Sequence, residues 1–404
     1  MKVSVRGSIL DLLAFQGLPK ARRKHIAHAP ATPLPVHPVN LLAQQLHPER
    51  LHMIVSAVRD ETASTRTFRL MPDRSKGTPG LPYFRAGQYL SIKADVAGVR
   101  ITRPYSISSA PFESLGKDGC YEITVRRVRD GFFSPVMLEA WRVGTRVQAS
   151  GPLGWFYHEP LRDAHTIVGL AGGSGVTPFR SMAREIVHGG MDAELLLLYG
   201  SSDQGDIVFF DELNQLQAQA HDRFRVVHVL SCEGVSLPNC EQGFITAEIM
   251  RKHADVEHGS FFVCGPQAMY EFVAGELAKL NRPRRRLRRE ALGEIKDISR
   301  HPNFPAGALG QTFRLKVRID GRQAEAPASA SETVLVAMER AGLAPPSACR
   351  SGECGFCRSL LVSGDVFVVP DGDGRRAADR QLGFIHPCSS YPLTDLELRV
   401  PGEC

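Results

Sequence analysis

The stretch SACRSGECGFCRSLLVSGDVF, residues 347–367, decides how the C-terminal part of the chain folds. It places Cys349, Cys354 and Cys357 on one loop, and Cys388 follows after thirty intervening residues. The spacing C-x4-C-x2-C…C supplies three thiolates from one loop and a fourth from elsewhere, which is the pattern of a [2Fe–2S] cluster. Zinc is an alternative, but zinc ligands usually come as two close pairs.

The other cysteines indicate the compartment. The chain has nine cysteines, an odd number, and its N-terminus lacks the ordered regions of a secretory signal. No stretch approaches the roughly 20 apolar residues of a membrane span. We therefore expect a reducing cytoplasm, with no disulfide framework. Four thiols show no partner pattern: Cys120, Cys232, Cys240 and Cys404.

The segments before the cysteine loop predict a small mixed domain. TFRLKVRIDGRQAEAP (312–327) predicts a hairpin, and SETVLVAMERAG (331–342) predicts a short helix. Residues 309–404 as a whole resemble a plant-type [2Fe–2S] ferredoxin domain, which has a β-grasp fold. By that resemblance the cluster ligands are Cys349, Cys354, Cys357 and Cys388.

Hydrophobic pattern and composition divide the rest of the chain into further segments. Residues 51–158 contain short alternating runs separated by turn residues, which predict an antiparallel β-barrel. Residues 159–282 alternate apolar strands with helical segments, which predict a parallel α/β sheet. The arginine-rich segment 283–308 is predicted to be a linker. Residues 1–50 form an N-terminal extension, with an extended linker over 29–40.

The charge of the chain is concentrated in that extension. Residues 1–50 contribute +5 of the net charge of +6. Such a basic run is more often a solvated segment than a nucleic-acid patch, so we expect no nucleic-acid partner. The apolar segment 8–18 is too short to span a bilayer, but an amphipathic helix that touches a membrane remains an alternative.

Two turns in the predicted barrel are candidate binding sites. RPYSISS (103–109) combines an arginine, an aromatic residue and hydroxyls. VRRVRDGFFS (125–134) places a glycine three residues before a serine, in a turn whose N–H groups and hydroxyl can hold an anion. Taken alone, either turn is equally consistent with a structural role.

Two turns in the α/β region point to a nucleotide. GLAGGSGVTPFRSM (169–182) is a strand, a glycine-rich turn and a helix, a geometry that binds pyrophosphate at the helix N-terminus. VCGPQAM (263–269) ends a later strand at a carboxyl end, where open sheets bind ligands. A buried cysteine before a turn is the alternative reading of the second motif.

These four motifs occur in the order found in one family. Residues 51–282 resemble the ferredoxin–NADP reductase family, with a flavin-binding β-barrel followed by a pyridine-nucleotide domain. With the ferredoxin-like segment, the chain resembles single-chain reductases of the phenylacetyl-CoA epoxidase reductase and phthalate dioxygenase reductase type.

The resemblance implies roles at the flavin. Tyr105 stacks on the flavin ring and Arg103 neutralises the flavin phosphates. Ser106 is a catalytic candidate because it hydrogen-bonds near flavin N5, and Ser108 is a weaker candidate for binding. The pyrophosphate is cradled by Gly131 and Ser134.

The resemblance also implies roles at the nicotinamide nucleotide. Cys264 is a second catalytic candidate because it lines the nicotinamide pocket, with Met269 as a neighbour. The pocket also includes Gly265 and Pro266. The phosphate turn consists of Gly172, Gly173, Gly175 and Thr177.

Two cofactor choices rest on finer features. GPLGWF (151–156) resembles the FAD branch, with Trp155 or Phe156 near the adenine, and FMN is the alternative.

For the nucleotide, Ser202 stands where many family members have arginine. Asp203 and Asp206 would repel a 2′-phosphate. We therefore expect NADH. NADPH is the alternative if Arg225 or Arg251 approaches from elsewhere.

The expected function is NADH-dependent electron transfer through a flavin and [2Fe–2S] to a partner protein that accepts single electrons. That partner is an oxygenase, a desaturase or another redox enzyme. The predicted linker is expected to let the ferredoxin domain swing. One alternative is an NADH-oxidising subunit of a membrane-associated complex, docked through residues 1–50, and another is a redox sensor.

Overall fold

The computed structural model describes residues 8–29, 35–48, 50–129, 131–232, 237, 240–281, 284–290, 292–295, 297–370 and 373–401. The chain forms two compact units, residues 1–44 and 45–404. Cys404 and residues 30–34 of the predicted extended linker lie outside the described residues.

The N-terminal extension contains two helices, α1 (Ile9–Ala27) and α2 (Pro38–Leu46). The prediction of an extended linker is wrong for residues 38–40, which form the start of α2. Pro38 fits there because the first helical residue needs no N–H donor. No helix in the described ranges has the length and hydropathy needed to cross a membrane.

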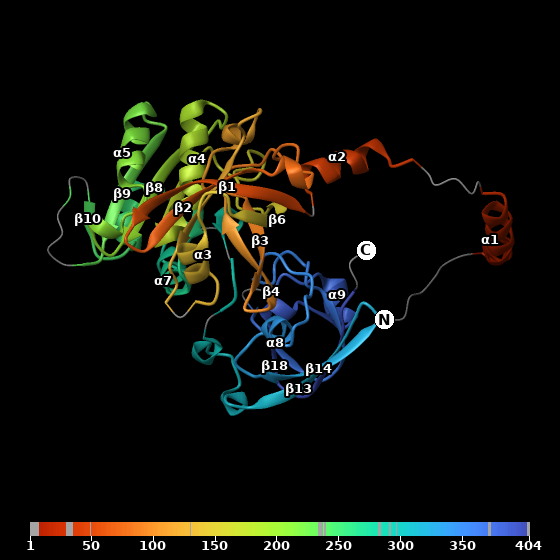
Figure 1. Cartoon of the computed structure of the whole chain (residues 1–404). Coiled ribbons are helices and arrows are strands. Elements are labelled where there is room, and N and C mark those ends of the chain that lie inside the picture. Colours follow the sequence, from red (N-terminus) through yellow and green to blue (C-terminus); the bar gives the residue numbers. More distant parts are fainter. Residues whose placement is uncertain are drawn as a thin grey trace. The chain divides into compact units, whose positions relative to one another are not determined.

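The predicted antiparallel barrel is confirmed for the domain that follows (Figure 1). Its strand order is β4-β3-β6-β1-β2-β5, and each neighbouring pair is antiparallel. A bridge between Ile107, just after β4, and Ile123 in β5 links the two edges. The elements are β1 (Leu51–Thr62), β2 (Thr65–Pro72), β3 (Tyr89–Val96), β4 (Val99–Ser106), β5 (Tyr121–Arg126), α3 (Ser134–Ala140) and β6 (Arg146–Leu153).

The predicted parallel α/β sheet is also confirmed, with the strand order β10-β9-β8-β7-β11-β12. Its strands are β7 (Thr166–Gly172), β8 (Glu194–Ser201), β9 (Phe224–Leu230), β10 (Cys240–Gln242), β11 (Ser260–Cys264) and β12 (Leu287–Arg289). Its helices are α4 (Thr177–His188), α5 (Phe210–Gln219), α6 (Ala247–His253) and α7 (Gln267–Ala278), with short 3-10 turns at η3 (Gly173–Val176) and η4 (Gln204–Asp206).

Alternation along β8 explains why helices cover both faces of this sheet. Leu195 and Leu197 pack in the core beneath α4 and α5, whereas Leu196 and Leu198 pack in the core beneath α6 and α7. Continuous apolar strands of this kind are typical of parallel sheets buried on both sides.

The C-terminal domain has the predicted β-grasp arrangement. The hairpin β13–β14 is antiparallel, β13 pairs in parallel with β19, and α8 contributes Leu335 and Met338 to the core. The elements are β13 (Thr312–Ile319), β14 (Arg322–Ser329), α8 (Val334–Arg340), β15 (Ser359–Ser363), β16 (Val366–Val368), α9 (Ala377–Gln381), β17 (Phe384–Ile385), β18 (Ser390–Pro392) and β19 (Leu396–Arg399).

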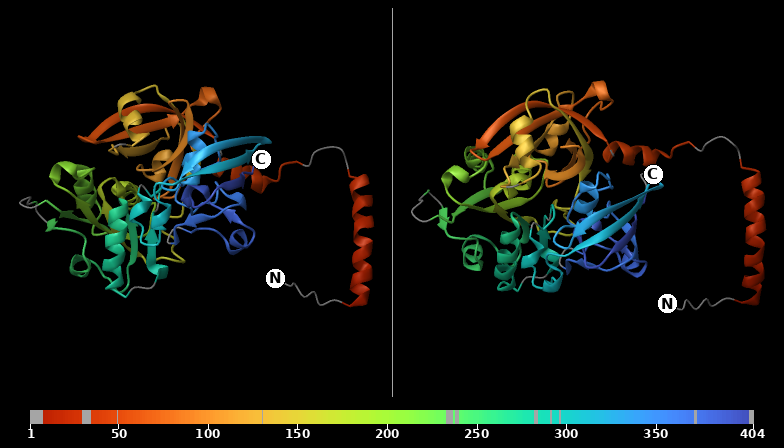
Figure 2. Two further views of the ribbon diagram at one scale, coloured as in Figure 1. Left: turned by 90° about the horizontal axis from the view of Figure 1, so that it is seen from below. Right: turned by 60° about the horizontal axis from the view of Figure 1, so that its bottom comes forward.

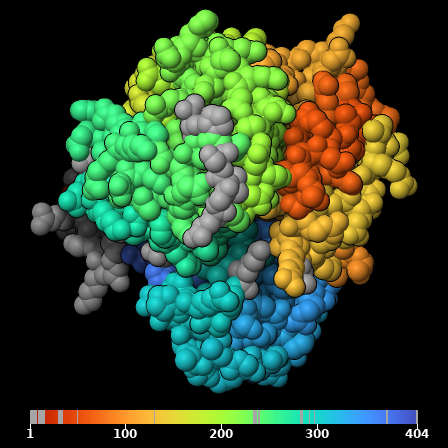
Figure 3. Space-filling view, turned by 90° about the vertical axis from the view of Figure 1, so that its left-hand side faces the viewer, coloured from red at the N-terminus to blue at the C-terminus, as the bar shows by residue number. Residues whose placement is uncertain are grey.

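The prediction of a linker over 283–308 is wrong at both ends. Strand β12 pairs in parallel with β11, and its Arg288 forms an ion pair with Asp163. Ile298 and Phe304 pack in a small core of the ferredoxin domain with Tyr391. The connection is therefore short, and the flavin, α/β and ferredoxin domains of residues 45–404 can be followed together in Figures 2 and 3.

Candidate active site

The four predicted cluster ligands lie together. The Sγ atoms of Cys357 and Cys388 are 3.4 Å apart. Backbone N–H groups point at the sulfurs, as they do where a protein stabilises thiolates. The amides of Ser351 and Cys354 each donate to Cys349 Sγ at 3.4 Å, and the amide of Gly352 donates to Cys388 Sγ at 3.2 Å. This donor set fits a cluster held by four thiolates.

The backbone of the cluster loop explains its small residues. Gly352 has φ +86° and Gly355 has φ +75°, values that glycine adopts without strain. A Cβ on Gly374 would lie 2.6 Å from the carbonyl oxygen of Gly352, so a second loop packs tightly on the first. His386 Nδ1 hydrogen-bonds to the same carbonyl at 2.5 Å.

The thiols do not ionise alike. Hydrogen bonds from Cys354, Cys388 and Ser351 lower the pKa of Cys349, although burial opposes this shift. Hydrogen bonds to Cys349 and Cys357, together with burial, raise the pKa of Cys388. Bound iron requires all four as thiolates, so cluster binding releases protons.

The glycine-rich turn and the C-G-P turn meet at the carboxyl ends of β7 and β11. These strands pair in parallel, with Ala171 opposite Cys264. A Cβ on Gly175 would lie 2.1 Å from the carbonyl oxygen of Cys264, and a Cβ on Gly172 would lie 2.5 Å from Met269 Sδ. Two motifs far apart in the sequence therefore form one crevice of the kind that binds nucleotides.

The start of α4 completes this crevice. Gly173 has φ +52° and opens the 3-10 turn η3, and Thr177 Oγ1 donates to the carbonyl of Ser174 at 3.0 Å. On the other side, Pro266 directly precedes α7. Both helices thus begin at the same edge of the sheet, where a helix N-terminus favours a bound anion.

Cys264 is a protonated thiol in this setting. It is buried, and burial raises the pKa of Cys264 well above its usual value, with Glu290 raising it further. The hydroxyl of Tyr270, on α7, accepts a hydrogen bond from the Gly265 amide at 3.3 Å and donates to the Glu290 carbonyl. This contact ties the C-G-P turn to the end of β12.

Glu290 is a site residue that sequence reasoning missed. Its side chain is buried, and burial raises the pKa of Glu290 well above its usual value, as do Glu353 and Cys349. Its backbone amide donates to the carbonyl of Val263 at 3.0 Å, so Glu290 lies beside the strand that ends in the C-G-P turn. The only sequence signal is an acid that ends the run RRRLRRE, a run that is equally typical of a domain boundary.

The flavin motif occupies the end of β4. Tyr105 pairs with Leu90 and Ser106 pairs with Tyr89 on the adjacent strand β3. The rings of Tyr105 and Phe133 are 6.3 Å apart, and burial raises the pKa of Tyr105.

The predicted pyrophosphate turn forms a compact unit. Ser134 Oγ accepts from the Val128 amide at 3.0 Å, and a Cβ on Gly131 would lie 3.2 Å from that oxygen. A side chain at Gly131 would therefore press on the hydroxyl.

Ser108 is placed differently from its prediction. Its side chain is fully buried, its hydroxyl is 2.9 Å from the Thr124 hydroxyl, and its carbonyl accepts from Arg180 at 2.9 Å. This placement contradicts direct contact with a flavin. Ser108 instead helps to join the barrel to α4.

Arg126 is a second residue that was missed. It ends β5 in the barrel, yet its Nη2 atom donates to Asp206 at 2.5 Å in the α/β domain. A Cβ on Gly173 would lie 2.8 Å from Arg126 Nη1, so this guanidinium lies beside the nucleotide turn. Asp206 is therefore paired with a cation, which reduces the repulsion of a 2′-phosphate that was expected from its charge.

Three other residues were predicted to influence the choice between NADH and NADPH: Asp203, Arg225 and Arg251. Asp203 is exposed just before η4. Arg225 donates to the carbonyl of His253, and Arg251 donates to the carbonyl of Lys279. Both arginines thus bind helix C-termini rather than the turn after β8, which leaves the expectation of NADH in place.

The predicted adenine contact at Phe156 is wrong. Phe156 is buried in the core of the α/β domain, with ring centroids 5.8 Å from Phe179 and 5.2 Å from Phe262. Trp155 is 72% exposed. An adenine cannot stack on a ring that is enclosed in a protein core.

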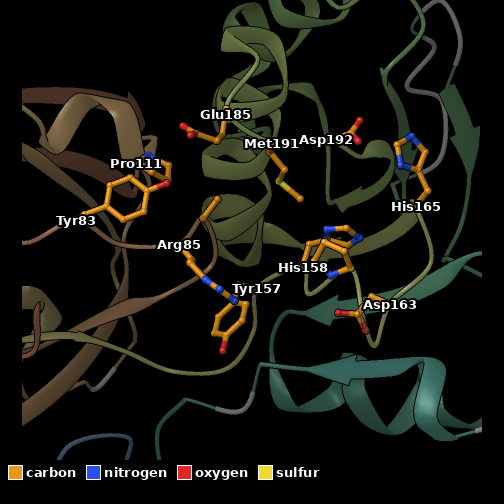
Figure 4. A pocket seen from close by; sticks show the side chains of 13 residues that line it. Tyr83, Arg85, Pro111, Tyr157, His158, Asp163, His165, Glu185, Met191 and Asp192 are labelled. Carbon is orange, nitrogen blue, oxygen red and sulfur yellow. The ribbon is translucent and has the colours of Figure 1, made fainter. Parts of the chain in front are cut away.

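A cavity of about 350 Å³ lies where the barrel meets the α/β domain, and Figure 4 shows its lining. It shares no residue with the flavin, nucleotide or cluster motifs. Arg85 pairs with Glu159 at 2.7 Å and lies 4.5 Å over the Tyr157 ring, so the charge of this arginine is already paired. The lining includes Tyr83, Arg85, Tyr157, His158, His165 and Glu185.

Comparison with known families defines the class of protein. Residues 52–158 match the oxidoreductase FAD-binding domain, 170–275 the oxidoreductase NAD-binding domain, and 317–393 the 2Fe-2S iron-sulfur cluster binding domain. The chain is therefore an NAD(P)H-dependent oxidoreductase that carries an FAD-binding domain, an NAD-binding domain and a [2Fe–2S] cluster-binding domain.

Known proteins of similar length support this assignment. The ferredoxin reductase component of 3-ketosteroid-9-alpha-monooxygenase from Rhodococcus rhodochrous is 28% identical over 352 residues, covering 85% of this chain and 94% of that protein. A component of 1,2-phenylacetyl-CoA epoxidase from Escherichia coli is 25% identical, covering 77% and 86%. The solved structure of phthalate dioxygenase reductase shares the fold, with a TM-score of 0.61, 24% identity and coverage of 87% and 98%.

Proposed function

We propose that this chain is the reductase component of an oxygenase system, which takes electrons from NADH and delivers them singly to a partner oxygenase. One observation carries the proposal: the cluster loop rests on the flavin motif. Arg350 of the cluster loop donates to the carbonyl of Thr102 at 3.3 Å, immediately before the R-P-Y-S motif. The related oxygenase components named above support the class of partner.

When bound, FAD accepts a hydride and releases its electrons singly, and the cluster carries one electron at a time. The work of the chain is to bind and orient these groups. We assign Tyr105 and Ser106 to the flavin ring. We assign its phosphates to Arg103, Gly131 and Ser134.

At the nucleotide, Gly172, Gly173, Gly175 and Thr177 form the phosphate turn, and Arg126 lies beside it. Cys264, Gly265 and Pro266 line the nicotinamide pocket. Because its pKa is raised by burial, Cys264 acts there as a neutral packing group rather than as a nucleophile. The cluster ligands are Cys349, Cys354, Cys357 and Cys388.

We assign the preference for NADH over NADPH to the turn after β8. Ser202 and Asp203 are exposed there, and a carboxylate disfavours a 2′-phosphate. The domain limits that we propose are 51–158 for the flavin domain, 159–290 for the nucleotide domain and 298–404 for the ferredoxin domain.

The proposal is tested with the purified holoprotein and two acceptors. Ferricyanide accepts electrons from a reduced flavin, whereas cytochrome c reports delivery of single electrons through the cluster. We expect NADH to support both reductions. An oxygenase encoded nearby should then turn over its substrate only when this chain and NADH are present. Reduction of ferricyanide without cytochrome c would overturn the proposal.

A cytoplasmic location is part of the proposal. The eight described cysteines are all free thiols, as cluster ligands and a reducing compartment require. The alternative of a subunit in a membrane-associated complex is not favoured by the comparisons.

The basic N-terminal extension nevertheless lies outside all three family matches, which begin at residue 52. We propose that it makes a peripheral contact with an anionic surface. Cosedimentation with vesicles containing phosphatidylserine, lost at high salt and on removal of residues 1–44, would support this contact. Equal sedimentation of the truncated protein would contradict it.

A further inference from the structure

Arg350 joins three parts of the chain at a buried point. It lies in the cluster loop between Cys349 and Ser351, and its side chain is fully buried. Its Nη1 and Nη2 atoms donate to the two carboxylate oxygens of Glu339 in α8 at 2.5 and 2.8 Å. Nη2 also contacts Glu294 in the connection, and Nη1 donates to Thr102 in β4.

Glu339 faces two arginines from different domains. Its Oε2 atom lies 3.8 Å from Arg103 Nη1, in the flavin motif, and the glutamate is only 5% exposed. Helix α8 contacts strand β4, and the two elements can be seen beside each other in Figure 1. A single carboxylate thus lies between the guanidinium of the cluster loop and the guanidinium of the flavin motif.

This arrangement exceeds what the ferredoxin fold alone requires. The pair between Glu339 and Arg350 is internal to the ferredoxin domain and would stabilise that domain in any context. The contacts to Thr102 and Arg103 cross the border between domains. Buried charges are costly unless paired, so loss of the carboxylate penalises the docked arrangement directly.

We propose that Glu339 is a positioning residue that docks the ferredoxin domain on β4 of the flavin domain and thereby controls how fast the cluster is reduced. The inference rests on the proposed function. Electron count is unaffected: the hydride of NADH brings two electrons, two single-electron steps remove them, and the proton is released to solvent. Glu339 acts on the distance between the two groups, not on hydride transfer.

The test compares Glu339→Gln with Glu332→Gln in the full-length holoprotein. Glu332 is a matched control because it lies just before α8 and pairs at 2.6 Å with Arg340, the last residue of that helix, with its side chain 20% exposed. The first readout is hydrogen exchange in β4, measured with and without bound cofactors. We expect faster exchange over Val99–Ser106 in Glu339→Gln and no change in Glu332→Gln.

The second readout is single-turnover spectroscopy with NADH. We expect bleaching of the flavin at the wild-type rate in both variants. The cluster signal should develop on the order of tenfold more slowly in Glu339→Gln, because misplacement of reacting groups has effects of this size or larger. Glu339→Asp, which keeps the charge but shortens the reach, should slow the same step by a smaller factor.

Wild-type exchange in β4 and a wild-type rate of cluster reduction in Glu339→Gln would overturn the inference. If Glu339→Gln fails to retain its cluster, Glu339→Asp decides: unchanged exchange and rate in that variant overturn the inference as well. Failure of NADH to reduce the cluster in the wild-type protein would instead overturn the proposed function, while the exchange measurement on β4 would still test docking.

Discussion

Gly175 lies so close to Cys264 that a Cβ atom on the glycine would be 2.1 Å from the cysteine's carbonyl oxygen. No backbone atoms can tolerate that approach. The nucleotide turn and the C-G-P turn therefore touch only because residue 175 has no side chain. The crevice between β7 and β11 depends on this contact.

We expect Gly175→Ala to separate the two turns and to lower the rate of flavin reduction by NADH about a hundredfold at subsaturating NADH. Dithionite should still reduce the cluster, since the ferredoxin domain is untouched. Stopped-flow absorbance at 450 nm measures the first effect, and EPR measures the second.

Gly275→Ala is the matched control. Gly275 lies in α7, and a Cβ added there would have nothing within 4 Å. This substitution should leave flavin reduction unchanged and stabilise the helix by about 0.5–1 kcal/mol. Equal kinetics in the two variants would contradict the account of the crevice.

The turn after β8 provides a test of nucleotide choice. The double substitution Ser202→Arg with Asp203→Ser removes an exposed carboxylate and adds a group that binds phosphate bidentately. We expect kcat/KM for NADPH to rise about tenfold, equivalent to ~1.4 kcal/mol. Asp192 is an exposed acid of the same domain, and Asp192→Ser should leave kcat/KM unchanged for both NADH and NADPH. An unchanged kcat/KM for NADPH in the double variant would show that the turn after β8 does not determine the choice between NADH and NADPH.

Substitution of a cluster ligand separates flavin reduction by NADH from electron delivery through the cluster. Cys354→Ser should abolish the rhombic EPR signal and reduce cytochrome c reduction to background. Ferricyanide reduction by NADH should persist, because it needs only the flavin. Cys232→Ser, at an exposed thiol, should match the wild type in all three measurements. A persistent cluster signal in Cys354→Ser would refute the ligand assignment.

The burial of His228 predicts that the free energy of unfolding depends on pH. It is buried in β9, neither ring nitrogen has a hydrogen-bond partner among the described residues, and burial lowers the pKa of His228 from 6.5 to about 4. The unfolded chain therefore binds the proton more tightly than the folded chain, and stability falls as the pH falls from 6.5 toward 4. Between pH 7.5 and 5.5 the loss should be about 1 kcal/mol.

Hydrogen exchange in β9 measures this opening free energy at the two pH values. In His228→Leu the loss assigned to this histidine should disappear. The same pH dependence in the variant and the wild type would show that another group is responsible.

Most of the fold and site predictions came from local sequence motifs. The spacing of Cys349, Cys354 and Cys357 is set by backbone geometry within a few residues, so it can be read from the sequence. The glycines at 172, 173 and 175 mark a turn after a strand, although the groups that Gly172 and Gly175 approach, Met269 and Cys264, lie far away in the sequence. The barrel and the α/β sheet were predictable for the same reason, because alternation and apolar runs are local signals.

The contacts between domains could not be predicted in this way. Arg126, Glu290 and Glu339 act on residues far away in the sequence, and no local pattern tells which turns will meet. Strand β12 was missed because an edge strand tolerates charged residues, and its arginines find partners in Asp163 and the Tyr270 ring. Phe156 was misplaced because burial in a neighbouring core is a tertiary property.

Anaerobic titration of the holoprotein with NADH, followed by visible absorbance and EPR, tests the central claim most directly. The account predicts bleaching of the flavin near 450 nm together with a rhombic signal from the reduced [2Fe–2S] cluster. Bleaching of the flavin without any cluster signal would contradict it, because the cluster loop would then not receive electrons from the domain on which it rests.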